Sequence, residues 1–283
     1  MPTNSSPTKN DRREEAKAAA AALRAKQQRD QARQRTIAIA SLVALLAVVG
    51  VLVAVILGQS KTPSDAQVTP SFGSERGGVV FDASGPVTPP ADQSTKAADG
   101  TATAWPVNSG DVPVISVYFD FLCPYCGQFE TSVGPTIDEL VSSGDVLLDS
   151  HPVSILDRAS AGSNYSTRTA AAAWEIAEKS PEHYSDFVEA LMGKQPAEGT
   201  TGLTDAEIAA TAVEVGVPQD VADALADGTY TWWVAEATDL ASQDLGQLST
   251  PTVMINGEKL DPSTTNYFDP EVLTAAIAAA QQG

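Results

Sequence analysis

Hydrophobic and polar residues follow three different patterns along this chain. Residues 37–57 read IAIASLVALLAVVGVLVAVIL, an apolar run of 21 residues that carries no charge and only Ser41 as a polar side chain. Residues 58–110 are rich in Pro, Ser, Thr, Gly and Asp, a composition typical of a linker. From Asp111 onward, short β-branched runs alternate with longer Ala-rich segments. This alternation predicts an α/β domain over residues 111–283.

The pattern within this domain predicts the order of its elements. Strands are expected at residues 112–121, 146–155 and 252–255, with an Asn-Gly turn leading to a short strand at 258–260. A helix kinked or divided by Pro135 is expected at 128–141, and a capping box at Thr204 and Glu207 predicts another helix start. A short apolar island at residues 78–82 is a possible edge strand within the linker. The remaining predicted helices are at residues 166–179, 181–192, 205–215, 218–226, 231–245 and 270–281.

The long apolar run predicts a transmembrane helix, because 21 helical residues span the ~30 Å hydrocarbon core of a bilayer. Residues 1–36 carry nine Lys or Arg and four acids, so with a net charge of −19 the rest of the chain carries −19 − 5 = −24. The positive-inside rule then predicts a cytoplasmic tail at residues 1–36 and an extracytoplasmic domain after the span. An uncleaved anchor is favoured over a signal peptide, whose apolar region is usually only ~7–15 residues long.

The chain has two cysteines, Cys123 and Cys126, in the stretch FDFLCPYCGQF. A tetrahedral zinc site needs about four ligands, and the two histidines, His151 and His183, lie 25 and 57 residues beyond Cys126. A structural disulfide across two intervening residues closes a very small loop, so its entropic stabilisation is slight. The small number of possible ligands therefore disfavours a metal site, and we expect no metal. The short loop disfavours a structural disulfide.

A redox pair agrees better with the position of the cysteines between a predicted strand and a helix. The helix N-terminus would stabilise a thiolate on Cys123, and Pro124 would set the turn. Cys126 would then resolve a mixed disulfide by thiolate exchange. A C-x-x-C motif beside such a pattern is typical of thioredoxin-like proteins.

The sequence FDFLCPYC, followed by helices, STPTVMING and a terminal helix, resembles the DsbA-like thioredoxin-fold family over about residues 111–281. With its tail, span and linker, it resembles the membrane-anchored members of high-GC Gram-positive bacteria. The resemblance implies a thioredoxin fold with a helical insertion at about residues 158–246 and thiol–disulfide oxidoreductase activity. It also implies a cis peptide at Thr250–Pro251 that faces the active-site loop with Pro124 and Tyr125 and binds extended substrate. No metal, flavin or nucleotide cofactor is implied.

Several single residues extend or limit this resemblance. DsbA has a His where this chain has Tyr125, so we expect Cys123 to be less acidic than in DsbA. Asp120 is a candidate proton shuttle for Cys126, or else a helix-capping or exposed loop acid. His151 is expected at the surface after a strand and His183 in solvent. The adjacent pair Trp232 and Trp233 is expected in the core.

These observations predict an extracytoplasmic enzyme that forms disulfides in exported proteins through its CPYC pair. Its expected partners are folding proteins with cysteines and a membrane redox partner that reoxidises the pair; no nucleic-acid partner is expected. The same residues also suit a reductase or an isomerase. A different class of function, a non-catalytic module that binds peptides at Pro251, stays open as well.

Overall fold

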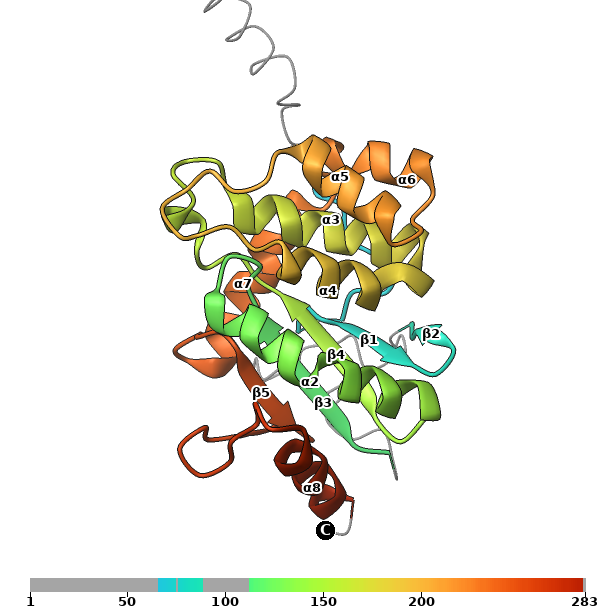
Figure 1. Cartoon of the computed structure of the whole chain (residues 1–283), viewed down its shortest axis with the longest axis vertical. Coiled ribbons are helices and arrows are strands. Elements are labelled where there is room, and N and C mark those ends of the chain that lie inside the picture. Colours follow the sequence, from blue (N-terminus) through green and yellow to red (C-terminus); the bar gives the residue numbers. More distant parts are fainter. Residues whose placement is uncertain (1–65, 75, 89–111, 282–283) are drawn as a thin grey trace, which may run out of the picture. The chain divides into compact units, whose positions relative to one another are not determined.

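The computed structural model describes residues 66–74, 76–88 and 112–281, which form one sheet with helices around it (Figure 1). The basic tail at residues 1–36 and the transmembrane segment expected at residues 37–57 lie outside the described residues. Within the described ranges, no helix is both long enough and apolar enough to cross a membrane.

The sheet has six strands in the order β2-β1-β4-β3-β5-β6. They are β1 (Val79–Asp82), β2 (Gly85–Pro86), β3 (Val114–Phe119), β4 (Leu147–Pro152), β5 (Thr252–Ile255) and β6 (Glu258–Lys259). The central strand β3 pairs in parallel with β4 and antiparallel with β5. All six residues of β3, VISVYF, are buried, and only Ser116 among them is polar, as expected of a central strand with both faces covered.

A block of helices is inserted in the chain between β4 and β5. The helices of the domain are α2 (Pro124–Ser143), α3 (Tyr165–Lys179), α4 (Tyr184–Gly193), α5 (Asp205–Glu214), α6 (Gln219–Ala224), α7 (Thr231–Leu245) and α8 (Pro270–Ala280), with short 3-10 helices η1 (Asp157–Ala159), η2 (Pro181–His183) and η3 (Leu225–Asp227). Figure 1 shows α3 to α6 gathered beyond one end of the sheet. The predicted helical insertion is therefore confirmed.

Helix α2 begins earlier than its sequence pattern predicts. Pro124 occupies the first turn, where its missing N–H costs no hydrogen bond, and Gly144 ends the helix in the left-handed conformation at φ 79°. Pro135 lies inside the helix, which continues from Pro124 to Ser143 and is not divided there. The helix expected to start at residue 128 thus starts at the CPYC motif itself and brings Cys126 into its first turn.

Side-chain caps define the starts of two other helices. At α5, the Thr204 hydroxyl accepts from the backbone N–H of Glu207, whose carboxylate accepts from the backbone of Thr204, so the predicted capping box is confirmed. At α8, the carboxylate of Asp269 accepts hydrogen bonds from the backbone N–H groups of Glu271 and Val272. Aromatic contacts then hold the α8 end of the chain against α2, with the Phe129 and Tyr267 ring centroids 6.0 Å apart.

Part of the expected linker belongs to the folded domain. Strand β1 pairs antiparallel with β4, opposing Val79 to Ser150, and Val79 and Val80 are completely buried. Before β1, Phe72 packs against the core, and its backbone N–H donates to the carboxylate of Glu178 at 2.9 Å. The possible edge strand at residues 78–82 is therefore confirmed as β1, and residues 66–74 and 76–88 of the expected linker lie in the described fold. The apolar residues of this segment are too few to show periodicity, but they extend the sheet by pairing with β4.

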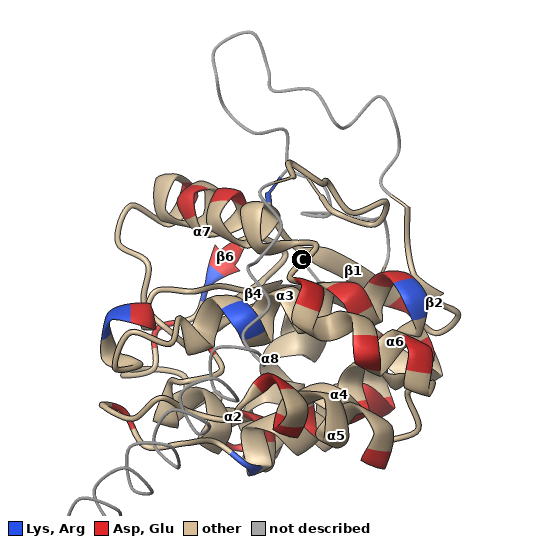
Figure 2. Cartoon of the chain, turned by 90° about the horizontal axis from the view of Figure 1, so that it is seen from above, with Lys and Arg blue, Asp and Glu red and all other residues tan. Residues whose placement is uncertain are grey.

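Acidic residues occur along most of the helices, while basic ones are sparse (Figure 2). This distribution follows from the composition, 36 Asp and Glu against 17 Lys and Arg in the whole chain. A few cations are paired across elements of the helical block, as in the ion pair between Arg168 of α3 and Asp205 of α5. An excess of charge of one sign favours solubility in proteins generally.

Candidate active site

The two cysteines lie at the junction of β3 and α2. Cys123 is the N-cap residue of α2 with extended φ and ψ of −76° and 115°, and Cys126 lies within the first turn. Both are free thiols, and both are buried, Cys123 with 6% of its surface exposed and Cys126 with 1%. The pair is thus held in a fixed turn, with Cys123 the more accessible sulfur.

Hydrogen bonds to Cys123 favour its thiolate. Its pKa is lowered to about 6, mainly by the hydrogen bond with the Cys126 thiol, against the opposing effect of burial. Smaller contributions come from the Thr250 contact and from the backbone N–H groups of Cys126 and Tyr125 at the start of α2. Cys123 is consequently ionised to a large extent at neutral pH, the state in which a cysteine is nucleophilic.

Cys126 is perturbed in the opposite direction. Burial raises the pKa of its thiol well above the ordinary value, and the hydrogen bond and the charge of Cys123 raise it further. At neutral pH the pair therefore holds one thiolate and one thiol. Such an asymmetric pair can exchange disulfides through Cys123 while Cys126 keeps its proton.

A loop from the far end of the chain completes the surroundings of Cys123. The Cys123 Sγ lies 3.2 Å from the carbonyl oxygen of Thr250, and the peptide bond between Thr250 and Pro251 is cis. The hydroxyl of Tyr267 donates to the carbonyl oxygen of Pro251 at 3.3 Å and so ties the loop to the chain before α8. The structure therefore brings together the CPYC loop and the Thr250–Pro251 loop, as the family resemblance implies; substrate binding there stays a prediction.

The surface beside this loop is open and partly aromatic. Tyr125 has 65% of its surface exposed, the most exposed large apolar side chain of the described residues. An open hollow next to it is lined by Gln128 and Ser132 of α2 and by Phe268 and Asp269 at the start of α8. A polypeptide bound at Cys123 would have room to lie across this side of the motif.

Asp120 is neither an exposed loop acid nor the cap of α2. It is completely buried, and one carboxylate oxygen accepts from the backbone N–H of Leu122 at 2.8 Å and from the hydroxyl of Ser166 at 2.7 Å. The other oxygen accepts from the backbone N–H of Leu156 at 2.9 Å. Burial nevertheless raises the pKa of Asp120 to about 6. A hydrogen bond from the Asp120 backbone also reaches Cys126, so the residue adjoins the buried thiol.

The expectation that His151 lies at the surface is wrong. His151 is completely buried within β4, its Nε2 lies 2.7 Å from Oδ2 of Asp149, and its ring stacks on Tyr118 at 4.0 Å between centroids. Gly78 covers this pair so closely that a Cβ there would lie 2.5 Å from His151 Nε2. The sequence could not show this burial, because it results from the pairing of β1 with β4, which places Gly78 over the side chains of Asp149 and His151.

His183 lies in η2, and Trp232 and Trp233 lie in α7 of the helical block. The His183 side chain is 26% exposed, so it is partly buried rather than fully solvated. Trp233 is buried, as expected, and packs edge-on against Trp174 with centroids 5.9 Å apart, while Trp232 is half-buried at the edge of the core. In residues 66–74, 76–88 and 112–281, no group of three or more His, Cys, Asp or Glu could hold a metal ion.

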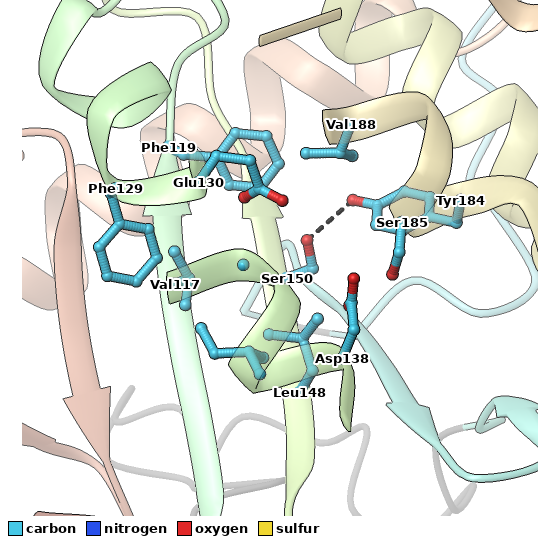
Figure 3. A pocket seen from close by; sticks show the side chains of 12 residues that line it. Val117, Phe119, Phe129, Glu130, Asp138, Leu148, Ser150, Tyr184, Ser185 and Val188 are labelled. Carbon is cyan, nitrogen blue, oxygen red and sulfur yellow. Dashed lines mark hydrogen bonds between the residues drawn. The ribbon is translucent and has the colours of Figure 1, made fainter. Parts of the chain in front are cut away.

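Two polar features near the motif were not singled out from the sequence. A cavity of about 30 Å³ lies between α2, α4 and the sheet, where burial raises the pKa of Glu130 to about 8 (Figure 3). Ser150 and Tyr184 are hydrogen-bonded at 2.8 Å in its wall. The second feature is Gln195, whose side chain bonds the CPYC loop. In the sequence, Glu130 looks like a solvent-facing acid of a helix and Gln195 like a solvent-facing glutamine of a loop. Neither could therefore be recognised from the sequence alone.

Comparisons with known proteins agree with this architecture. A family model described as thioredoxin matches residues 110–274. BdbD from Bacillus subtilis shares 19% identity with a TM-score of 0.54, covering 77% of this chain and 100% of that one. The thiol-disulfide oxidoreductase MdbA from Actinomyces oris shares 20% identity with a TM-score of 0.54, covering 78% of this chain and 97% of the other. Both likenesses are in fold.

One relative of this chain is a much longer protein. The serine/threonine-protein kinase PknE of Mycobacterium tuberculosis is 31% identical over 170 residues, which cover 58% of this chain and 29% of the kinase. The chain thus spans less than a third of the length of that relative. The family match extends from β3 to the start of α8 and includes both loops of the candidate site. The chain belongs to the thioredoxin family, with a DsbA-like fold in which a helical block is inserted between two core strands.

Proposed function

We propose that this chain is an extracytoplasmic thiol–disulfide oxidoreductase that forms disulfides in exported proteins through Cys123 and Cys126. The observation that carries the proposal is the asymmetry of the pair, a Cys123 with its pKa lowered to about 6 beside a Cys126 with its pKa raised. Oxidoreductase activity is also supported by MdbA, a thiol-disulfide oxidoreductase with the same fold. Because of this asymmetry, Cys123 would be the sulfur that forms the mixed disulfide with the substrate, and Cys126 would be the thiol that is protonated when the pair is reduced.

The reaction begins with the pair as a disulfide. A substrate thiolate attacks Sγ of Cys123, the Cys123–Cys126 bond breaks, and Cys126 leaves as a thiolate that takes up a proton. A second substrate thiolate then attacks the substrate sulfur of the mixed disulfide and expels the Cys123 thiolate. Two electrons pass from the substrate dithiol to the pair. The low pKa of Cys123 favours the second step, because a more acidic thiol leaves faster.

The surroundings of the pair suit a polypeptide substrate. The carbonyl oxygen of Thr250 lies 3.2 Å from Cys123 Sγ, at the start of the loop that leads into β5. Pro251 and Thr250 would pair with the backbone of an extended substrate segment, while Pro124 and Tyr125 would border it on the other side. Asp120, buried beside Cys126, would exchange the proton that the Cys126 thiolate takes up or releases.

The proposed organisation of the chain places this reaction outside the cytoplasm. Residues 1–36 would form a basic cytoplasmic tail, residues 37–57 a membrane anchor and residues 58–110 a linker that contains the edge strand β1. Residues 111–283 would form the catalytic body. The reduced pair would be reoxidised by a membrane redox partner, since the chain itself offers no further cysteine. An oxidising compartment allows the products to persist.

Trapping tests catalysis against the alternative of a peptide-binding module with an inert disulfide. A Cys126→Ser variant cannot resolve a mixed disulfide, so it should accumulate covalent adducts through Cys123 when expressed in cells. Cys123→Ser is the matched control and should accumulate none. Adducts that form equally in both variants, or in neither, would refute the proposed exchange.

The equilibrium with glutathione decides the direction of the reaction. A reduction potential of the full-length chain near the about −120 mV of DsbA would support an oxidase, and one near the about −270 mV of thioredoxin a reductase. Because Tyr125 lacks the charge of a histidine, we expect a value between these two. An isomerase would in addition reshuffle a scrambled model substrate without net oxidation.

A further inference from the structure

A glutamine of the helical block holds the CPYC loop through two hydrogen bonds. Gln195 follows α4, and its Nε2 donates to the carbonyl oxygens of Phe121 and Cys123, both at 2.8 Å. These two carbonyls lie on either side of Leu122, in the turn between β3 and α2. A side-chain amide has two N–H donors, and these two contacts are shorter than the third contact of Nε2, with Sδ of Met192 at 3.5 Å.

The chemistry of the contact determines the orientation of the amide. With its two ends exchanged, Oε1 would face two carbonyl oxygens, and three acceptors would meet without a hydrogen between them. In the correct orientation Oε1 points at Gly127, where an added Cβ would lie 2.6 Å from it. The glycine in CPYCG therefore leaves the space that the Gln195 side chain fills.

The Cys123 carbonyl connects this contact to the reactive sulfur. Its oxygen also accepts from the backbone N–H groups of Cys126 at 2.9 Å and Gly127 at 3.3 Å, the first hydrogen bonds of α2. The backbone N–H groups of Tyr125 and Cys126, which lower the pKa of Cys123, belong to the same turn. The direction in which they point depends on how firmly that turn is held.

We infer that Gln195 is a positioning residue that sets the reactivity of Cys123 from the helical block. By binding the Phe121 and Cys123 carbonyls, it fixes the first turn of α2 so that backbone N–H groups face the sulfur. It also places partial positive charge beside two carbonyl oxygens close to the thiolate, in surroundings of low dielectric. The inference rests on the proposed function of the cysteine pair.

The first test is a Gln195→Ala variant of the full-length chain. The pKa of Cys123, followed by the ultraviolet absorbance of its thiolate, should rise by about one unit, a tenfold weaker ionisation. At pH 7 the equilibrium with glutathione should then shift about fivefold toward the protein disulfide, equivalent to about 20 mV. The pKa can be measured even if wild type exchanges nothing with glutathione, so the test does not depend on the proposed activity.

A second variant displaces the same side chain without removing it. Gly127→Ala places a methyl group against Gln195 Oε1, and so should also raise the pKa of Cys123. In a helix, Ala is favoured over Gly by about 1 kcal/mol, so thermal stability should not fall. Since both changes break one contact, the double variant should shift the pKa no further than Gln195→Ala alone.

A distant glutamine provides the control. Gln219 of α6 bonds the Asp223 carboxylate at 2.8 Å on the exposed surface, and Gln219→Ala should leave the Cys123 pKa unchanged. The inference would be overturned if Gln195→Ala lowered the stability of the oxidised and reduced forms equally with no shift in the Cys123 pKa. Additive shifts in the double variant would also overturn it. Should Gln195→Ala fail to fold, Gly127→Ala decides alone, and an unchanged pKa refutes the inference.

Discussion

Replacing Asp120 with Asn isolates the effect of burying one carboxyl group beside the redox pair. In the folded chain the pKa of Asp120 is raised from 3.8 to about 6, because burial outweighs the hydrogen bonds from Leu122, Ser166 and Leu156. In the unfolded chain the same group returns to its ordinary value. The difference makes folding depend on pH through this single residue.

The sign follows from proton binding. Between about pH 4 and about pH 6, the folded state keeps a proton on Asp120 that the unfolded state has lost, so stability falls as the pH rises. A shift of about two pKa units corresponds to about 3 kcal/mol, lost progressively across this window and constant above it. Asn does not titrate, so Asp120→Asn should be free of this loss.

Asp120→Asn should also lower the free energy of unfolding by an amount that does not depend on pH. The carbonyl oxygen of the new side chain can accept from Leu122 and Ser166, but its amide N–H would face the N–H of Leu156. A buried donor left unsatisfied in this way costs about 1–3 kcal/mol. The slope of stability against pH, not its absolute value, therefore carries the information. Other titrating groups, such as Glu130, act in both proteins and cancel in the difference.

Urea unfolding of the oxidised full-length chain, in mild detergent at a series of pH values, measures this slope. We expect the free energy of unfolding of wild type to fall by about 3 kcal/mol relative to Asp120→Asn between about pH 4 and about pH 7. Parallel curves for the two proteins would refute the argument that burial dominates the Asp120 environment. In the reduced form, slower resolution of a mixed disulfide by Cys126 in the variant would support Asp120 as a proton shuttle.

Three further substitutions test other parts of the structure. Tyr125→His should lower the Cys123 pKa below its value of about 6, by about one unit, because a nearby imidazolium favours a thiolate; an unchanged thiolate titration would contradict this. Gly78→Ala should cost about 1–3 kcal/mol in urea unfolding, because its Cβ collides with buried side chains of β4. Gly193→Ala, which meets no atom within 4 Å, is its control, and equal stabilities would mean that the segment before β1 yields easily. Thr204→Ala should cost about 1 kcal/mol through the lost capping box, and Thr204→Ser should restore most of it; a smaller melting shift for Ala than for Ser would be inconsistent with capping.

The elements with strong local signals were predictable from the sequence. The boundaries of α7 and β5 coincide with the predicted residues 231–245 and 252–255, since each has a clear period and a clear end. The capping box of α5 needs only Thr204 and Glu207, three positions apart, so it too can be recognised from the local sequence. The helical insertion follows from the order of such elements along the chain.

Features that depend on tertiary pairing were predictable only in part. A short strand at residues 78–82 was expected, but its place beside β4 depends on pairing with a segment some seventy residues later. The burial of His151 and Asp149 follows from the same pairing. Gln195 contacts Cys123 across 72 residues, and nothing in its neighbourhood in the sequence distinguishes it from a surface glutamine. The CPYC motif marked the site, but the residues that tune it were found only in the fold.

The contact between Cys123 and Thr250 spans 127 residues of sequence. The contact requires β5 to be paired with β3, the strand that leads to Cys123. In an unfolded chain, Cys123 lacks the fixed Cys126 thiol and the helix N–H groups that lower its pKa. The acidity of Cys123 is thus a property of the folded chain alone. A newly made chain would exchange disulfides more slowly than the folded one, because ordinary thiols are mostly protonated at neutral pH. The appearance of an acidic thiol would report that the turn around the pair has formed.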